Sequence, residues 1–311
     1  MHYQYLPELL MKSAILESTH ITSTKFNTRF ITKPLSMLRI RFLALSLGLL
    51  FASVATLAQS PLDTYAPFDP ANTQTRIVTD FDSYYFSGGH RFYSMRFGYD
   101  YGIPNNRHRM GIAIPVVHCI FNGDFAGFEN TTGIGDIRFT YVGVPYLSKD
   151  PLGLQKVAAS MEVTTPTGNY RLGRGVGSWV FRPGLTLSYQ LDMDWYLFPQ
   201  VRFQFSTTEV NSRAGADGLP DLNDPQKDEQ LQNINLTIPT YYMLRDWQGW
   251  IGLTVDTDFT FVEDTYFLFV KTEVGKMLTP KTSALLQITQ FVAGQPRLNT
   301  VFSAHINFFL R

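Results

Sequence analysis

Two alternating runs near the middle of the chain constrain the fold most strongly. Apolar side chains occupy every second position from Trp179 to Leu191 and again from Trp195 to Phe205, with Asp192-Met193-Asp194 between the runs. Successive side chains of a strand point to opposite faces, so the pattern predicts a hairpin with one apolar face and one polar face. Each run exceeds the usual soluble strand of about 5–6 residues and matches the roughly 9–11 residues that cross a bilayer. We therefore expect an all-β fold, a transmembrane antiparallel up-and-down β-barrel.

The same alternation recurs along most of the chain after residue 73. It predicts twelve strands, an even number that places both ends of a barrel on one side of the membrane. The expected strands are 75–86, 91–103, 108–121, 134–146, 154–165, 179–191, 195–206, 232–244, 247–258, 266–277, 281–292 and 297–310. Proline cannot donate a hydrogen bond to a neighbouring strand. We therefore expect the prolines within these strands to lie at bulges or near a rim; they are Pro115, Pro145, Pro183, Pro199 and Pro239.

The connections between the expected strands are sorted by length. The long connections, at 122–132, 166–178 and 207–230, fall on one side of the barrel, and the connections on the opposite side are short. Outer-membrane barrels have short periplasmic turns and longer outer loops. A chain of this length could also form one large soluble domain. A soluble sandwich, however, has no reason to sort its loops in this way.

The first part of the chain has the features of an export signal. A short basic segment at 37–41 precedes the apolar run Phe42–Leu50, and small residues at cleavage spacing end at Ala58. These features predict a signal peptide at 37–58, because the apolar run is shorter than the roughly 20 residues of a spanning helix. We interpret 1–36 as an upstream extension, 59–72 as a periplasmic N-terminal tail and 73–311 as the barrel. The tail could instead fold back into the mouth of the barrel.

Charge and cysteine content exclude several classes of function. Removing residues 1–58 leaves 20 basic and 24 acidic residues, and the chain has no basic run, so we expect no binding of nucleic acid. Cys119 is the only cysteine, which rules out an intramolecular disulfide and a cysteine metal cage. We expect it to be a buried thiol. We also expect no metal, no cofactor and no catalytic residue.

The polar faces of the expected strands carry both acids and bases. They predict either a lumen lining that sets selectivity or a set of ion pairs that fills a narrow lumen. The residues are Asp80, Asp82, Arg96, Asp100, Asp136, Arg138, Lys156, Glu162, Arg182, Arg202, Asp256 and Asp258, and the same face also carries Lys271 and Glu273.

Two other classes of function remain open at this stage. A lipid-acting barrel enzyme would need a nucleophile and a base, and His305 with Ser303 on the same strand face is the best local arrangement. A structural or adhesion barrel would use the polar loop at 207–230. For the barrel itself, we expect contact with outer-membrane lipids and lipopolysaccharide, insertion by the barrel-assembly machinery, and a small-molecule solute.

Residues 133–206 resemble a family of Gram-negative outer-membrane proteins described as "putative MetA-pathway of phenol degradation", or as transporter-like. The resemblance implies a bacterial outer-membrane barrel and the passage of small, often hydrophobic or aromatic compounds. It is carried by Gly133-Ile134-Gly135-Asp136-Ile137, Thr165-Pro166-Thr167-Gly168, Leu172-Gly173-Arg174-Gly175, Arg182-Pro183-Gly184 and the strand with Tyr196, Pro199, Phe203 and Ser206.

Overall fold

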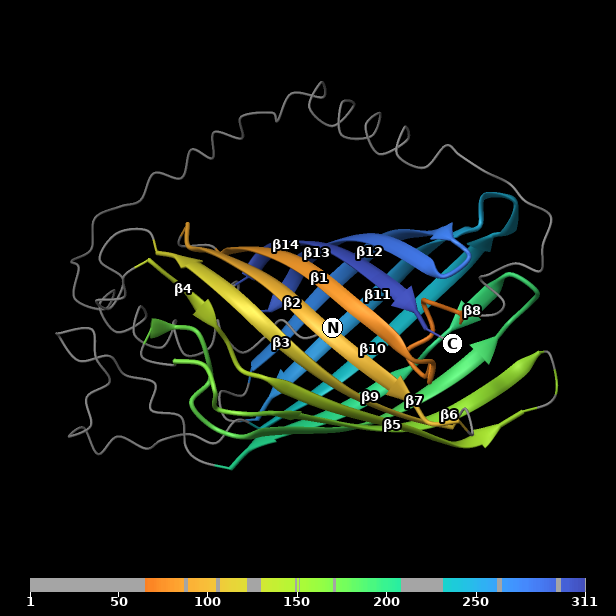
Figure 1. Ribbon diagram of the computed structural model, residues 1–311, viewed down its shortest axis with the longest axis horizontal. Coiled ribbons are helices and arrows are strands. Elements are labelled where there is room, and N and C mark those ends of the chain that lie inside the picture. The colour runs from red at the N-terminus through yellow and green to blue at the C-terminus, as the bar shows by residue number, and fades with distance from the viewer. Residues whose placement is uncertain are drawn as a thin grey trace, which may run out of the picture.

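The computed structural model forms a closed antiparallel β-barrel (Figure 1). It describes residues 65–86, 89–104, 107–121, 130–148, 150, 152–169, 172–207, 232–261, 265–294 and 298–310. The expected upstream extension, the expected signal peptide and most of the 207–230 loop lie outside the described residues.

The wall consists of fourteen strand segments joined mostly by tight turns. In chain order they are β1 (Arg76–Phe86), β2 (Arg91–Gly102), β3 (His108–Ile120), β4 (Thr131–Ile134), β5 (Arg138–Leu147), β6 (Gly153–Thr164), β7 (Val180–Gln190), β8 (Trp195–Leu197), β9 (Gln200–Ser206), β10 (Gln232–Leu244), β11 (Gly249–Thr260), β12 (Thr265–Thr279), β13 (Thr282–Gly294) and β14 (Leu298–Phe309). One turn of 3₁₀ helix, η3 (Arg245–Trp247), joins β10 to β11.

These segments make twelve wall strands, which confirms the expected number. β4 and β5 both pair with β3, so they are two parts of one strand. β8 and β9 are likewise two parts of the strand between β7 and β10. Pairing of β14 with β1, and of β10 with β11, completes the ring.

The two interrupted strands show where the prolines are accommodated. The expected continuous strand 134–146 breaks between β4 and β5, opposite Pro115 of β3, whose carbonyl accepts a hydrogen bond from Gly135. Pro199 lies in the break between β8 and β9, and Pro239 lies opposite that break. Pro145 lies at a register shift between β5 and β6. Breaks and bulges therefore remove the ladder bonds that these prolines could not make.

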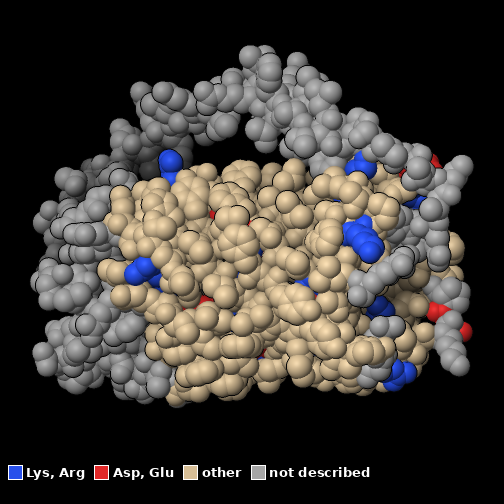
Figure 2. Space-filling model, viewed as in Figure 1, with Lys and Arg blue, Asp and Glu red and all other residues tan. Residues whose placement is uncertain are grey.

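The outward face is apolar around the barrel. Side chains such as Phe97, Ile114 and Leu253 are about half exposed, as expected for groups that contact lipid. Figure 2 shows a broad band of mostly uncharged side chains, with basic side chains toward both ends. Among the described residues, no helix has the length and apolar character needed to cross a membrane. The outward apolar band and the closed ring show a barrel of the outer-membrane type.

We call the rim at connections 121–130, 165–179 and 207–231 the outer rim, and the opposite rim the periplasmic rim, because long loops are outer loops in such barrels. Three clusters of buried apolar residues occur among the described residues: a small one that joins Ala71 to Val142, Val144 and Ala158, and two larger ones, one near each rim of the lumen. The periplasmic cluster consists of Phe68, Phe198, Tyr241, Met243, Trp250, Met277 and Phe309. The outer cluster consists of Phe86, Phe92, Val117, Cys119, Phe121, Phe267, Phe269, Leu298 and Val301.

Two residues of the outer cluster test the expectations from the sequence. Cys119 is fully buried, which confirms the expected buried thiol. The alternation of the expected strand 297–310 puts Leu298 in one file with Thr300 and Phe302 and so predicts that Leu298 points outward; this prediction was wrong. A register shift between Tyr85 and Phe86 in the pairing of β1 with β14 lets Leu298 pack into the lumen instead.

Candidate functional site

The segment before β1 occupies the periplasmic mouth of the lumen. In Figure 1 it is the orange trace beside the C label, next to β8. Phe68 is buried among aromatic rings from three wall strands, with ring centroids 5.3 Å from Tyr196, 5.4 Å from Tyr241 and 5.7 Å from Trp250. Tyr65 stacks on Phe309 with centroids 4.7 Å apart. The segment thus supplies the central ring of the periplasmic cluster.

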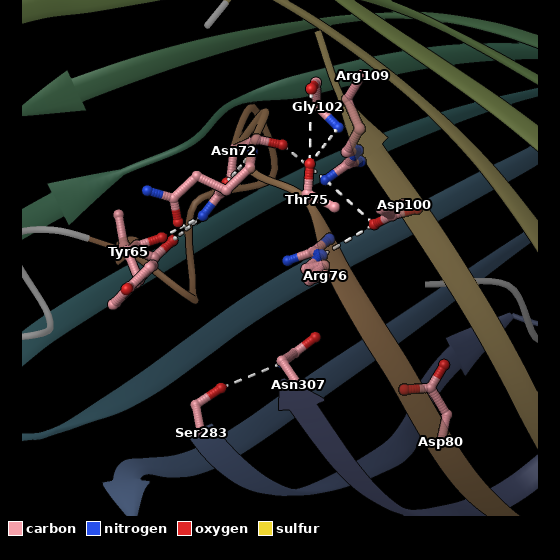
Figure 3. Close-up of polar contacts among 12 residues, drawn as sticks. Tyr65, Asn72, Thr75, Arg76, Asp80, Asp100, Gly102, Arg109, Ser283 and Asn307 are labelled. Carbon is pink, nitrogen blue, oxygen red and sulfur yellow. Dashed lines mark hydrogen bonds and ion pairs between the residues drawn. The ribbon is translucent and has the colours of Figure 1, made fainter. Parts of the chain in front are cut away.

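Polar contacts fasten the same segment to the wall. Asp69 is buried, accepts a 2.5 Å bond from Lys156 Nζ and a 3.4 Å bond from Ser188 Oγ, and caps the backbone N–H of Ala71. Arg109 Nη1 donates to the carbonyl of Asn72 at 2.6 Å, and Figure 3 shows this guanidinium between Asn72 and Asp100. Of the two arrangements considered for the tail, the contacts of residues 65–72 match the second, in which the chain folds back into the mouth; residues 59–64 lie outside the described residues.

The start of β1 is held where the segment enters the wall. Thr75 Oγ1 accepts a 2.9 Å bond from the backbone of Gly102, and Arg76 Nε donates to Asp100 at 2.8 Å (Figure 3). A side chain at position 102 would place its Cβ 2.1 Å from the carbonyl oxygen of Thr73, so the close approach requires glycine there. These contacts fix the direction in which the segment leaves the wall.

A network of charged residues lies in the middle of the lumen on the β1 side. Arg96 donates to Asp80 through Nε at 2.7 Å, and His305 Nδ1 lies 2.7 Å from the other oxygen of Asp80. The imidazole of His305 is therefore engaged by a carboxylate through Nδ1. Ser303, which the sequence analysis pairs with His305 for the alternative of a barrel enzyme, is the register partner of Asp82.

Two further buried ion pairs occur on other wall strands. Arg182 donates to Glu162 at 2.6 Å and to the amide oxygen of Gln204 at 2.5 Å. Lys271 pairs with Asp256, whose other oxygen accepts bonds from Asn235 at 2.7 Å and Thr237 at 2.9 Å. Buried charges are tolerated when they are paired and hydrogen-bonded, as these are.

Asp136 has a different role from the ion pairs. It lies in the break between β4 and β5 and accepts backbone N–H bonds from Gly168 at 2.7 Å and Val176 at 2.6 Å. Arg174 donates to the carbonyl of Thr132 at 2.9 Å. The described residues of the 165–179 connection are thus fastened to the broken strand, and Asp136 binds this connection by its backbone.

The structure places all twelve sequence-predicted residues in strands or breaks of the wall. Arg138 and Arg202 lie on β5 and β9, and Arg202 donates to Gln200 at 2.6 Å. Asp82 and Asp258 are buried almost completely. Sequence reasoning missed Asp69, Arg76 and Arg109 as members of the network. Asp69 follows no strand pattern, and no signal in the sequence marks it as a partner of Lys156.

The outer cluster forms an aromatic wall near the opposite rim. Phe92 lies between Phe86 and Phe121 with centroids 5.1 Å and 5.5 Å away, both edge to face. The ring of His90 lies 6.2 Å from Phe121, and burial lowers the pKa of this imidazole, which favours its neutral form. The lumen therefore combines apolar groups near both rims with paired charges between them. Such a lining can contact an apolar solute, and among the described residues it offers few unpaired charges to an ionic one.

Comparison with known proteins gives matches of two kinds. The model of the family described as "Putative MetA-pathway of phenol degradation" matches residues 68–224. The outer membrane channel COG4313 from Pseudomonas putida F1 is similar in structure, with a TM-score of 0.60, 15% identity, and coverage of 78% of this chain and 99% of that chain. The NanC porin aligns with a TM-score of 0.49, 11% identity, and coverage of 75% and 100%. A search of curated proteins found no match. The likeness to the COG4313 channel supports the barrel fold.

Proposed function

The chain belongs to the family described as "Putative MetA-pathway of phenol degradation", and from this premise we propose that it is an outer-membrane channel or passive transporter for small hydrophobic or aromatic molecules. The observation that carries the proposal is the composition of the lumen. Aromatic clusters lie near both rims, and the charges between them are largely paired.

The same lumen argues against a general porin. A wide polar pore needs unobstructed water between its walls, whereas here residues 65–72 pack into the periplasmic mouth. Twelve strands also enclose much less space than the 16–18 strands of porins with an aqueous channel. In such a narrow lumen, the twelve charged residues predicted from the sequence would mainly form ion pairs with one another and with residues 65–72. A lumen filled in this way would exclude hydrated ions.

A catalytic role is not part of the proposal. The Nδ1 atom of His305 faces Asp80, so this imidazole belongs to the ion-pair network of Arg96. The barrel would take its place among outer-membrane lipids and lipopolysaccharide after insertion by the barrel-assembly machinery, with the solute as the only ligand of its lumen. Nucleic acid has no place in this function.

Uptake by whole cells tests the proposal. Cells that express the protein should accumulate an apolar aromatic probe such as toluene faster than cells carrying an empty vector, and a hydrophilic sugar should enter both at the same rate. Single-channel recordings of the purified barrel in planar bilayers should show small conductance steps. Equal accumulation of toluene in both strains would contradict the proposal.

A further inference from the structure

We propose that the outward surface of β1, β2 and β3 carries a binding site for the phosphate group of one lipopolysaccharide molecule, with Arg91 and His118 as its polar contacts. The site faces the membrane rather than the lumen, so it does not depend on which solute the barrel passes. It is carried by the order of side chains near the outer rim on three paired strands, which lie side by side in Figure 1.

The pairing register aligns the outward side chains of these strands into rows. From the outer rim toward the middle of the wall, the rows consist of Tyr85, Arg91 and Ile120; Ser83, Tyr93 and His118; and Phe81, Met95 and Val116. The third row is apolar, and its side chains are exposed. The surface thus changes from cationic to apolar away from the rim, which matches a lipid whose phosphate lies above its acyl chains.

Arg91 is a cation at the boundary of the apolar band. Its side chain is exposed, and its guanidinium carbon lies over the ring of Tyr85, 5.7 Å from the ring centroid. In the part of the chain that the structure describes, no carboxylate forms an ion pair with Arg91. Arginine binds phosphate through parallel charge-assisted hydrogen bonds, so an anionic head group at this level has a matching partner.

His118 offers a second polar contact in the adjacent row. Its ring stacks on Tyr93 with centroids 6.2 Å apart, and its Nδ1 lies 2.7 Å from Thr132 Oγ1. When the Thr132 hydroxyl donates to Nδ1, the proton of a neutral imidazole lies on Nε2, which can then donate to a phosphate oxygen. His118 is the diagonal neighbour of Arg91 across β2 and β3, at a separation of about 7–8 Å that long side chains can bridge.

The position of the cation is specific to this part of the rim. On the other described strands, the outward side chains nearest the outer rim are uncharged, such as Trp179, Phe205 and Tyr266. Tyrosine and tryptophan at this level suit any membrane interface. A cation does more, because it selects an anionic head group, and among the described strands it occurs at this level only on β2.

The apolar row next to the polar contacts identifies the anion as part of a lipid. A free phosphate would contact Arg91 and His118 and leave Phe81, Met95 and Val116 uncovered. A lipid covers this row with its acyl chains while its phosphate contacts the cation. Because the long connections mark this rim as the outer one, the phosphorylated lipid beside it is lipopolysaccharide.

Native mass spectrometry of the full-length barrel in detergent, titrated with lipid A, tests the site. Lipid A is the phosphorylated membrane anchor of lipopolysaccharide, and we expect one molecule to bind. Removing its phosphates, or replacing Arg91→Gln, should weaken binding about tenfold, because either change removes the charge-assisted hydrogen bonds. His118→Phe keeps a ring to stack on Tyr93 and should weaken binding about threefold. Neither variant should change the binding of dephosphorylated lipid A.

His108→Phe is the matched control. His108 lies on the same outward file of β3 at the periplasmic end, where its ring stacks on Tyr141 and its Nδ1 lies 2.8 Å from the Tyr141 hydroxyl. This variant should bind lipid A like the original protein. Excess inorganic phosphate should leave lipid A bound.

Equal binding of lipid A with and without its phosphates would overturn the site and leave a general lipid-facing surface. Equal losses in His108→Phe and His118→Phe would overturn it as well. Displacement of lipid A by inorganic phosphate would overturn the assignment to a lipid. Heat-dependent gel mobility confirms that each variant is folded.

Discussion

The two ends of the lumen contain the same kinds of side chain but differ in what those side chains contact. At the periplasmic end, Phe68 fills an aromatic cluster, and Asp69 and the backbone of Asn72 accept hydrogen bonds from Lys156 and Arg109. At the outer end, an aromatic cluster again adjoins polar groups, yet polar atoms of Gln204, Asn233 and Thr260 have no hydrogen-bond partner in the part of the chain that the structure describes. One end is thus closed by the segment before β1, and the other keeps buried polar atoms that the described residues do not satisfy.

The two ends of the lumen therefore differ in how well their buried polar atoms are satisfied. A buried polar atom without a partner costs about 1–3 kcal/mol, so the unsatisfied atoms at the outer end lower the stability of the barrel there. At the periplasmic end the segment already provides many contacts, although Arg109 Nε is also buried there without a hydrogen-bond partner among the described residues. Passage to the periplasm therefore requires the segment to move, or a narrow path beside it.

Removing residues 59–74 should produce the largest effect. The periplasmic mouth would lose Phe68 and Asp69, and we expect single-channel conductance to rise severalfold in planar bilayers. Lys156 would lose its carboxylate partner, so selectivity should shift toward anions, as measured by reversal potentials in a salt gradient. Conductance and selectivity equal to those of the full barrel would show that the segment does not limit the path.

Breaking the ion pair that orients Gln204 should destabilise the barrel strongly. Arg182→Met leaves the Glu162 charge buried without its partner, which costs about 3–5 kcal/mol of unfolding free energy. The double variant Glu162→Leu/Arg182→Met should recover most of this loss, because it removes both charges. Guanidinium unfolding of the three proteins measures the effect, and an additive double variant would contradict the coupling.

Phe68→Ala should separate the stability of the segment from that of the barrel. Loss of the ring should weaken docking of the segment by about 3 kcal/mol and increase fluctuations of the single-channel current. The unfolding midpoint of the barrel should stay unchanged, whereas Phe92→Ala in the outer cluster should lower it. Phe308→Ala on the lipid-facing surface is the control. A barrel midpoint lowered by Phe68→Ala would show that the segment is part of the global fold.

The ion pair between Lys156 and Asp69 should give the smallest effect. The Lys156 side chain is 27% exposed, so solvent screens the pair and we expect about 1 kcal/mol of coupling. A cysteine at the buried position Ala71 reports opening of the segment through its rate of thiol labelling. Lys156→Met, Asp69→Asn and the double variant complete a double-mutant cycle on that rate. Additive changes would show that the pair contributes nothing to docking.

The wall of the barrel was predictable because alternation is a redundant signal. Each strand alternates outward apolar and inward polar residues several times, so an isolated proline or a break does not hide the alternation. Leu298 was placed on the wrong face because a single register shift reverses every side chain beyond it. The break at 135–137 was missed because it depends on Pro115 in a neighbouring strand, whereas the break at 198–199 contains Pro199, which was expected at an irregularity of this kind.

The site was predictable only in its composition. The alternation of apolar and polar positions identified which charged residues lie on the polar faces of the strands. It could not identify which of these residues pair with one another. Asp80 meets His305 across 225 positions of sequence, and Asp69 meets Lys156 across 87. Such pairs follow from ring closure and strand stagger, which no local pattern contains. The unpaired atoms of Gln204, Asn233 and Thr260 were unpredictable for the same reason.

The hydrogen bond from Leu310 to the carbonyl of Thr75 has a consequence for biogenesis. The residue after the last strand is bonded to the residue before the first strand, at the point where the N-terminal segment turns into the mouth. The pairing of β14 with β1, which closes the wall, therefore encloses a segment that is synthesised before any of the strands. A chain stalled before β14 would leave both β1 and β13 with open edges and Tyr65 without Phe309 to stack on. The arrival of the last strand therefore completes both the wall and the stacking of Tyr65.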